Sequence, residues 1–388
     1  MDRTGGAHAL SSGRGRVLFL YTTAGRGGDA VQVLSMAEAL RRLGFSVTLA
    51  GPQRLRPYCF SGPASTARGL AKRLPWWVRD IAELGLNIMM FARAALIALR
   101  LRPDYILERV TPYGPAGVWL SRFLNVPLVA HLDAPFEVER AFRKESMFSS
   151  LHRGAVRRLG RCARLVVVGS QFSRRYYHSL GVPKSVMVVM RNGVFPEDIV
   201  PTPTRFQGQP VIGFVGSMAA WHRVDLLLEA VADLRRTGCD CRLLLIGTGE
   251  SYPTLVEHAA QLGLADAVEF TGPVDRAQAL RLLDQCTVAV LPHSLSTGSP
   301  MKLVEYAARA VPIVAPDLPN IREMWGSTVA YFTAQDSRAL SETLRSLIKD
   351  ERWRALLARA AWRRARQLYT WERQMAEVIS SLGNGGAA

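Results

Sequence analysis

The stretch 292–323, PHSLSTGSPMKLVEYAARAVPIVAPDLPNIRE, decides the fold class of the chain. It follows Val288–Leu291, a short apolar run that is typical of a buried strand. Ser299 and Pro300 then predict a helix start, with the serine as N-cap and the proline at the first helical position, where its missing N–H group removes no hydrogen bond. The residues between strand and helix are small or carry hydroxyl groups, which is typical of a ligand-binding loop.

The start of this helix predicts a site for a nucleotide diphosphate. The first amides of a helix, here those of Met301, Lys302 and Leu303, have no partner inside the helix, and the helix dipole favours an anion at that end. The Lys302 ammonium adds a positive charge. Glu305 lies one turn further along, where its carboxylate can accept hydrogen bonds from a sugar diol. Positive charge beside a diol acceptor suits a nucleotide.

Two segments of this stretch resemble a known family. Glu305–Ala308 (EYAA) and Val311–Ala315 (VPIVA) are similar to the EAMA and GxPVVA segments in the nucleotide-binding half of GT-B glycosyltransferases of family 4, the glycosyl transferases group 1 type. That motif has another glutamate eight positions before its second one, and this chain has Thr297 there. Arg191–Val194 (RNGV) is similar to the family's pNGVD. The resemblance covers residues 16–382 and is more specific in the C-terminal half.

Alternating apolar runs and helical segments predict an α/β fold. Val17–Tyr21, a glycine-rich turn, an amphipathic helix and Ser46–Ala50 form the first βαβ unit. The resemblance implies the GT-B architecture, two Rossmann-like domains whose parallel sheets face an interdomain cleft. We expect a disordered basic leader at 1–15, an N-terminal acceptor domain at 16–195, a linker at 196–210, a C-terminal nucleotide-sugar domain at 211–370, and a helix that crosses back to the N-terminal domain, followed by a tail, at 371–388.

The resemblance also implies which groups bind the diphosphate. In the family, the turn after the first strand of the second domain reads GRLxxxKG, and its Arg and Lys bind the diphosphate. Here this turn, residues 216–223, has Ser217 and His222 at those places and Arg223 where glycine is usual. We therefore expect Lys302 and Arg223 to bind the diphosphate, together with His222 if it is protonated.

The rest of the donor site follows from the same resemblance. Glu305 is expected to bind the ribose, the backbone at Val274 to recognise the base, and the loop 298–301 to hold the sugar hydroxyls. The expected donor-binding residues are Gly216, His222, Arg223, Gly247, Val274, Thr297, Gly298, Ser299, Pro300, Met301, Lys302 and Glu305.

The expected acceptor side lies in the N-terminal half. The segment Pro127–Arg140, PLVAHLDAPFEVER, resembles the family's segment at the cleft floor, with Asp133 where the family has Asn or His. His131 and Asp133 at the carboxyl end of a strand are typical of a ligand cleft, with a structural histidine as the alternative. Gly27 and Gly28 allow close approach of the backbone to a ligand, with a plain tight turn as the alternative. The expected catalytic residues are Asp133, Lys302 and Arg223.

Composition and charge narrow the class of protein. The 388 residues carry a net charge of +17, which attracts polyanions such as anionic lipid or nucleotide-linked substrates. No pattern typical of a nucleic-acid-binding module is found, so we expect no nucleic-acid partner. The five cysteines include no CxxC pair, which predicts free thiols and a reducing cytoplasm. The first residues lack the apolar core of a signal peptide. No aspartate pair is placed for Mg²⁺, so we expect no metal and no cofactor besides the nucleotide sugar.

The segment Trp76–Leu101 is helical by composition and has an apolar stripe made of Trp77, Ile81, Leu84, Ile88, Phe91 and Ala95. Charged residues interrupt it, so it falls short of the roughly 20 uninterrupted apolar residues of a transmembrane helix. One interpretation is a helix packed on the N-terminal sheet. The other is a helix that lies in a bilayer interface, because basic residues and two tryptophans stand at its start. The second would make the protein peripheral at the inner face of the plasma membrane.

Taken together, the sequence predicts a metal-independent, retaining glycosyltransferase of the hexosyltransferase type. It would move a sugar from a nucleotide-diphosphate sugar, with a UDP-sugar as first choice, to an acceptor glycan, a lipid-linked acceptor or a small aglycone, in cell-envelope or natural-product glycoside assembly. Thr297 cannot supply the charge of the family's first glutamate, so either the donor sugar differs or another carboxylate such as Asp133 serves. The alternatives are a non-catalytic nucleotide-sugar-binding or partner subunit, and a nucleotide-sugar epimerase.

Overall fold

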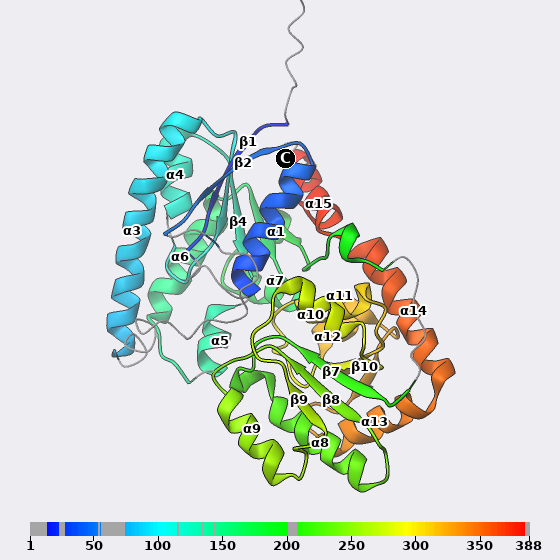
Figure 1. The fold of residues 1–388 in the computed structure, drawn as a ribbon. Helices are drawn as coiled ribbons and strands as arrows, with labels where there is room; N and C mark the ends of the chain where they lie inside the picture. Colours follow the sequence, from blue (N-terminus) through cyan, green and yellow to red (C-terminus); the bar gives the residue numbers. More distant parts are fainter. Residues whose placement is uncertain are drawn as a thin grey trace, which may run out of the picture.

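Two parallel six-stranded sheets, one in each half of the chain, form the framework of the protein (Figure 1). The structure, a computed structural model, describes residues 14–22, 28–52, 55, 74–114, 116–133, 135–142, 144–200 and 208–384. Helices connect successive strands and cover both faces of each sheet. The expected GT-B architecture of two Rossmann-like units is therefore confirmed.

The N-terminal sheet has the strand order β2-β1-β3-β4-β5-β6. Alternate residues of each strand point to opposite faces, and both faces are apolar because helices cover both. Helices α3, α4, α6 and α7 pack on one face, and α1 and α15 pack on the other. The strands are β1 (Arg16–Leu20), β2 (Ser46–Ala50), β3 (Tyr105–Arg109), β4 (Leu128–Leu132), β5 (Leu165–Val168) and β6 (Met187–Val189).

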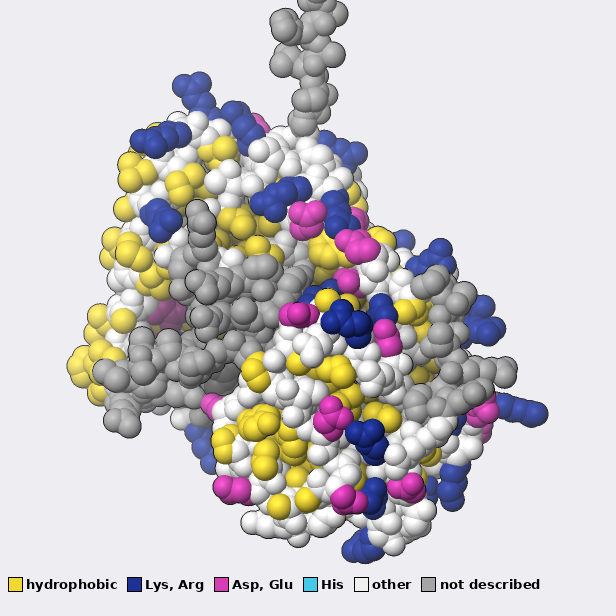
Figure 2. All heavy atoms as spheres, viewed as in Figure 1, with side chains coloured by type: hydrophobic (Ala, Val, Ile, Leu, Met, Phe, Trp, Pro, Cys, Tyr) yellow, Lys and Arg dark blue, Asp and Glu magenta, His cyan; other side chains and the backbone are white. Residues whose placement is uncertain are grey.

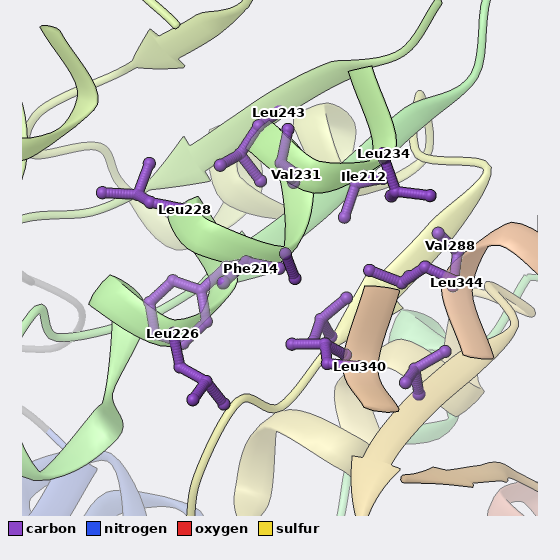
Figure 3. Close-up of a cluster of buried hydrophobic side chains, with 14 of the residues drawn as sticks. Ile212, Phe214, Leu226, Leu228, Val231, Leu234, Leu243, Val288, Leu340 and Leu344 are labelled. Carbon is purple, nitrogen blue, oxygen red and sulfur yellow. The ribbon is translucent and has the colours of Figure 1, made fainter. Parts of the chain in front are cut away.

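The C-terminal sheet has the order β12-β11-β10-β7-β8-β9 and the same two-sided core. Figure 3 shows the core between this sheet and helices α8 and α13, where Phe214, Leu226 and Leu340 are buried together. Helices α10, α11 and α12 pack on the other face. The strands are β7 (Val211–Val215), β8 (Arg242–Ile246), β9 (Val268–Phe270), β10 (Val288–Val290), β11 (Ile313–Pro316) and β12 (Ala330–Phe332).

The helices of the described residues have the following bounds: α1 (Gly28–Arg42), α3 (Trp76–Leu101), α4 (Ala116–Leu124), α5 (Phe136–Phe142), α6 (Ser149–Cys162), α7 (Gln171–Ser179), α8 (Val224–Arg236), α9 (Tyr252–Gln261), α10 (Arg276–Leu283), α11 (Met301–Ala308), α12 (Pro319–Trp325), α13 (Ser337–Lys349), α14 (Glu351–Leu368) and α15 (Trp371–Asn384).

The chain passes between the halves at two places that lie side by side. The amide of Val194 donates to the carbonyl oxygen of Tyr369 at 3.0 Å, and the amide of Trp371 donates to the carbonyl oxygen of Val194 at 3.1 Å. Helix α15 then packs on α1, with Trp371, Met375 and Val378 buried in the N-terminal core. The C-terminal residues are thus part of the N-terminal half. Most of the expected leader and part of the linker lie outside the described residues.

Helix α3 packs on the N-terminal sheet through a face that the apolar stripe indicated only in part. Its buried residues are Asp80, Asn87, Met90, Ala94 and Ala98. Of the stripe, Phe91 and Ala95 pack against the core, whereas Trp77, Ile81 and Ile88 are exposed. The packing interpretation is therefore confirmed for the helix, and part of the stripe remains on the outside.

Candidate active site

Helix α11 begins one residue later than the sequence predicted. Its first residue is Met301, and Pro300 occupies the N-cap position with φ −64° and ψ 112°. The prediction that Ser299 is the N-cap is wrong, because the Ser299 hydroxyl accepts a hydrogen bond from the Asn192 amide at 3.1 Å instead. The amide of Leu303 bonds to the Pro300 carbonyl oxygen at 3.3 Å.

Lys302 lies across the glycine turn that follows β7. Its Nζ is 2.8 Å from Nε2 of His222 and 5.0 Å from the centre of the Phe214 ring. Gly216 has φ +134°, and a Cβ atom there would lie 2.4 Å from Cε of Lys302, so only glycine allows this side chain to lie over the turn. Burial lowers the pKa of Lys302 to about 7, against the smaller opposing influence of Glu305. The ammonium is thus poised to gain stability from an anion.

The other two expected diphosphate ligands are placed differently from their predicted roles. Burial and the nearby Lys302 hold the pKa of His222 far below its ordinary value. His222 is therefore a neutral hydrogen-bond partner of Lys302 and not a second cation. Arg223 is the N-cap residue of α8 in the left-handed region, with φ 50°, and its Nε is 2.9 Å from Oδ2 of Asp225. The guanidinium is half-exposed and already paired with a carboxylate.

Glu305 lies on α11 one turn beyond Lys302, as the sequence predicted, and is buried. Its Oε1 is 3.3 Å from Nη2 of Arg276, whose Nη1 is 2.6 Å from Oδ2 of Asp198. Burial raises the pKa of Glu305, and Arg276 opposes that rise. Arg276 was not found from the sequence, because the start of α10 carries no motif and meets α11 only in the folded protein.

The glycine turns after β7 and β8 abut. Gly247 has φ +123°, and a Cβ atom there would lie 2.3 Å from the carbonyl oxygen of Gly216. The amide of Gly216 also donates to the carbonyl oxygen of Ile246 at 2.9 Å. Val274 lies after β9, the neighbouring strand, and is buried. These three expected donor residues therefore lie at the carboxyl ends of adjacent strands, where open α/β sheets bind ligands.

Residues of the N-terminal half bind the loop 297–299, which precedes α11. The hydroxyls of Ser170 and Ser173 donate to the carbonyl oxygen of Thr297 at 2.5 and 2.7 Å, and all three residues are buried. Asn192 Nδ2 donates to the carbonyl oxygen of Ser299 at 2.5 Å. The carbonyl oxygen of Gly298 accepts from Asn320 at 2.9 Å. The sequence indicated this loop and the RNGV segment that contains Asn192, but not the contacts between them, since these form only when the two halves of the chain meet.

Arg109, at the end of β3, organises the expected acceptor side. Its Nη2 is 3.2 Å from Oδ2 of Asp133 and 3.0 Å from Oδ1 of Asp29, and its Nε donates to Gln32 at 3.2 Å. Gln32 in turn donates to Asn192 Oδ1 at 2.9 Å. A chain of polar contacts therefore connects Asp133 with the loop before α11. Arg109 was missed because its strand end carries no recognised motif.

His131 lies on β4 two residues before Asp133 and is fully buried. Burial lowers the pKa of His131 to about 4, although Asp133 raises it. Neither ring nitrogen has a hydrogen-bond partner among the described residues. Gly28 is the exposed first residue of α1, and Gly27 lies outside the described residues. Of the predicted acceptor-side residues, the structure thus brings His131 and Asp133 together at one strand end.

Comparisons with known proteins identify the family of both halves of the chain. A model of the Glycosyltransferase Family 4 domain matches residues 26–198, and a model of the Glycosyl transferases group 1 domain matches residues 209–350. The D-inositol 3-phosphate glycosyltransferase of Thermobifida fusca is 26% identical over 90% of this chain and 87% of its own length. The glycogen synthase of Mycobacterium tuberculosis is 24% identical, and that match spans 70% of this chain and 66% of the relative.

The fold has a close counterpart among solved structures. Anabaena HepE in complex with UDP superposes with a TM-score of 0.72 and 21% identity, covering 94% of this chain and all of that protein. The two family domains follow each other along the chain in the order of the two sheets and together span both halves of the site. The chain belongs to the glycosyl transferases group 1, family 4, a family of GT-B enzymes that use nucleotide-sugar donors.

Proposed function

We propose that this protein transfers a hexosyl unit from a nucleotide-diphosphate sugar to an acceptor with retention, without a metal ion, and that UDP-sugar is the first candidate donor. The observation that carries the proposal is the position of Lys302 at the start of α11, over Gly216, with Glu305 one turn along. The similarity to HepE, which was crystallised with UDP and with UDP-glucose, supports the choice of base.

The chemistry follows from the charge that develops on the leaving group. When the glycosidic bond to the diphosphate breaks, negative charge grows on a phosphate oxygen, and a preorganised cation with helix-start amides stabilises it without reorganisation. Lys302 has a lowered pKa, so an arriving diphosphate favours its protonated form. When the donor binds, the Arg223 guanidinium leaves the Asp225 carboxylate and pairs with a phosphate group of the donor instead. Glu305, held by Arg276, accepts the ribose hydroxyls.

Asp133 is the proposed carboxylate near the reacting centre. It is paired with Arg109, whose Nη2 lies 3.2 Å from Oδ2 and holds the carboxylate in place at this strand end. Because Thr297 replaces the family's first glutamate and is held through its carbonyl oxygen, the donor-sugar contact differs here. An acceptor that is lipid-linked or a small aglycone, used in the cytoplasm at the inner face of the plasma membrane, fits the basic composition.

Isothermal calorimetry with a panel of UDP-, GDP-, ADP- and dTDP-sugars tests the donor site. The wild type should bind one base class, and Lys302→Ala should weaken that binding about 10- to 100-fold, the loss expected for a buried charge-assisted contact. Lys349→Ala, which removes an exposed lysine at the end of α13, is the matched control and should bind as the wild type does. Equal affinity of the Lys302→Ala variant would reject the assignment.

A non-catalytic nucleotide-sugar-binding subunit is the second candidate, because Thr297, Ser217 and His222 replace three polar or charged groups of the family pattern. Nucleotide release in the presence of the bound donor distinguishes the two. The transferase predicts release that increases when acceptors are added, and the binding subunit predicts calorimetric binding without release.

A further inference from the structure

Helix α3 presents a continuous apolar surface on the outside of the N-terminal half. Of the thirteen large apolar residues that are exposed in the described part of the chain, seven lie on this helix. Ile88 and Leu96 are 60% and 68% exposed, and Phe123 on the adjacent helix α4 is 64% exposed. Figure 2 shows the apolar side chains along the margin where Figure 1 places α3. The seven residues are Trp76, Trp77, Ile81, Ile88, Met89, Leu96 and Leu99.

The exposed charged side chains on α3 and α4 are all basic. Asp80 and Glu83, the two acidic residues of α3, both face inward and are paired with Arg140 at 2.5 and 3.1 Å. Arg93 and Arg100, in contrast, are exposed on the same helix. Arg102 and Arg122 add two further exposed cations at its end and on α4. The surface therefore combines an apolar face with a rim that attracts anions.

The polar face of α3 fixes its orientation. Asp80 accepts hydrogen bonds from Tyr113 and from the amide of Phe148, and Asn87 accepts one from Thr111 at 3.1 Å. By length and composition α3 is the one helix of the described residues that passes as a candidate membrane span, with a mean hydropathy of 1.6 and only 22% of that window buried. Crossing a bilayer would break the contacts of Asp80 and Asn87, so the helix fits a bilayer only when it lies flat on it.

We propose that the α3–α4 surface, defined by the seven apolar residues of α3 together with Phe123, Arg93, Arg100, Arg102 and Arg122, docks this protein on an anionic lipid bilayer. The helix lies in the plane of the interface with Ile81, Ile88 and Leu96 in the acyl boundary. The arginines contact phosphate groups of the lipid. Because the exposed charges of α3 and α4 are all positive, an anionic bilayer fits this surface better than a second copy of this chain, which would place like charges opposite each other.

This docking does not depend on the transferase activity, so it can be tested separately. The full-length protein is mixed with vesicles of phosphatidylcholine, with and without phosphatidylglycerol, and co-sedimentation is measured at low and high salt. The wild type should bind the vesicles that contain phosphatidylglycerol and bind less at high salt. Ile88→Gln with Leu96→Gln should lower the partition coefficient at least about tenfold, because two side chains that enter the acyl region become polar.

Two further variants make the result specific. Val256→Gln with Leu356→Gln changes two exposed apolar residues of the C-terminal half and should bind as the wild type does. Arg93→Gln with Arg100→Gln should lose about tenfold or more of the binding to phosphatidylglycerol vesicles and none of any binding to pure phosphatidylcholine. Circular dichroism and calorimetric binding of UDP confirm that each variant is folded.

Several outcomes overturn the proposal. One is a wild type that does not sediment with phosphatidylglycerol vesicles, and another is equal sedimentation of the Ile88→Gln, Leu96→Gln variant. A third is a wild type that is dimeric by analytical ultracentrifugation, without vesicle binding, and becomes monomeric in that variant, since the surface would then join two copies. A fourth is bound protein that resists a carbonate wash, which indicates a spanning helix.

Discussion

At the scale of single residues, the burial of Lys302 predicts how diphosphate binding should depend on pH. The side chain lies among Phe214, Trp221 and a neutral His222, and burial lowers its pKa to about 7 from an ordinary value of 10.5. A bound diphosphate favours the charged form and raises this pKa again. The protein must therefore take up a proton when it binds a diphosphate at a pH above about 7.

This proton uptake predicts the pH dependence of UDP binding. Between about pH 7 and pH 9 the free protein loses the Lys302 proton while the complex keeps it, so affinity should fall by up to about tenfold per pH unit in this window. Calorimetry at about pH 7 and about pH 9, in buffers with different ionisation enthalpies, measures both the affinity and the protons taken up.

Lys302→Arg is the control for this prediction, because a guanidinium stays charged throughout the window. The variant should bind UDP with an affinity that depends little on pH. If the wild type bound UDP equally well at both pH values without taking up protons, the lowered pKa of Lys302 would be contradicted.

Sequence patterns located the residues that belong to a local motif and missed those that a distant segment supplies. Lys302 and Glu305 could be assigned because their spacing on one helix is fixed by the helical repeat. Arg109 and Arg276 could not, and Asn192 was located in the RNGV motif without its partners, since each of the three meets its partners only in the folded chain. The N-cap error at Ser299 has the same cause, as its hydroxyl binds an amide 107 residues away.

At the scale of elements, the strands were predicted well because central parallel strands are short continuous apolar runs. Ser46–Ala50 was predicted with the bounds that the structure shows, and the predicted runs Val17–Tyr21 and Val288–Leu291 differ from β1 and β10 by one residue at their ends. The packed face of α3 was predicted only in part, because Asp80 is buried through its pairing with Arg140 on α5 and its hydrogen bonds from Tyr113 and the Phe148 amide. Periodicity shows where a helix is apolar, but a buried ion pair can decide which face turns inward.

Asn192 connects the N-terminal half to the loop before α11, so Asn192→Ala should affect both stability and binding. The side-chain amide holds the carbonyl oxygen of Ser299 and accepts from Gln32, and both contacts are buried. Their loss should lower the free energy of unfolding by about 1–3 kcal/mol. It should also weaken UDP binding several-fold, because the loop before α11 in the proposed donor site loses its support. Urea unfolding and calorimetry measure the two effects.

The control is Gln261→Ala, which removes a side-chain amide from an exposed position at the end of α9. It should change neither quantity. If Asn192→Ala lowered the stability and left the UDP affinity unchanged, the contact would stabilise the fold without positioning the loop before α11 for binding.

At the scale of the whole molecule, the last helix completes the first sheet. Trp371 is 2% exposed and packs in the N-terminal core, although it follows the C-terminal domain in the sequence. Trp371→Ala should lower the stability of the N-terminal half by about 3–5 kcal/mol, the usual cost of emptying a buried tryptophan site. Hydrogen exchange followed by mass spectrometry should show faster exchange in α1 and β5 than in β7 and β8.

Glu377→Ala on the same helix, at an exposed position, is the matched control and should leave the exchange pattern unchanged. Equal acceleration in both halves of the Trp371→Ala variant would mean that the two halves unfold as one unit, contrary to the prediction.

The bonded pair of Val194 and Tyr369–Trp371 also restricts how the halves can move. Two segments that are hydrogen-bonded side by side resist sliding and twisting more than they resist bending. We therefore expect the two halves to rotate as rigid bodies about a hinge at this pair. Atoms of one half should then move further relative to the other half the further they lie from the hinge. Asn192 stands two residues from this pair along the chain, so its contact with Ser299 should survive a small swing of the two halves.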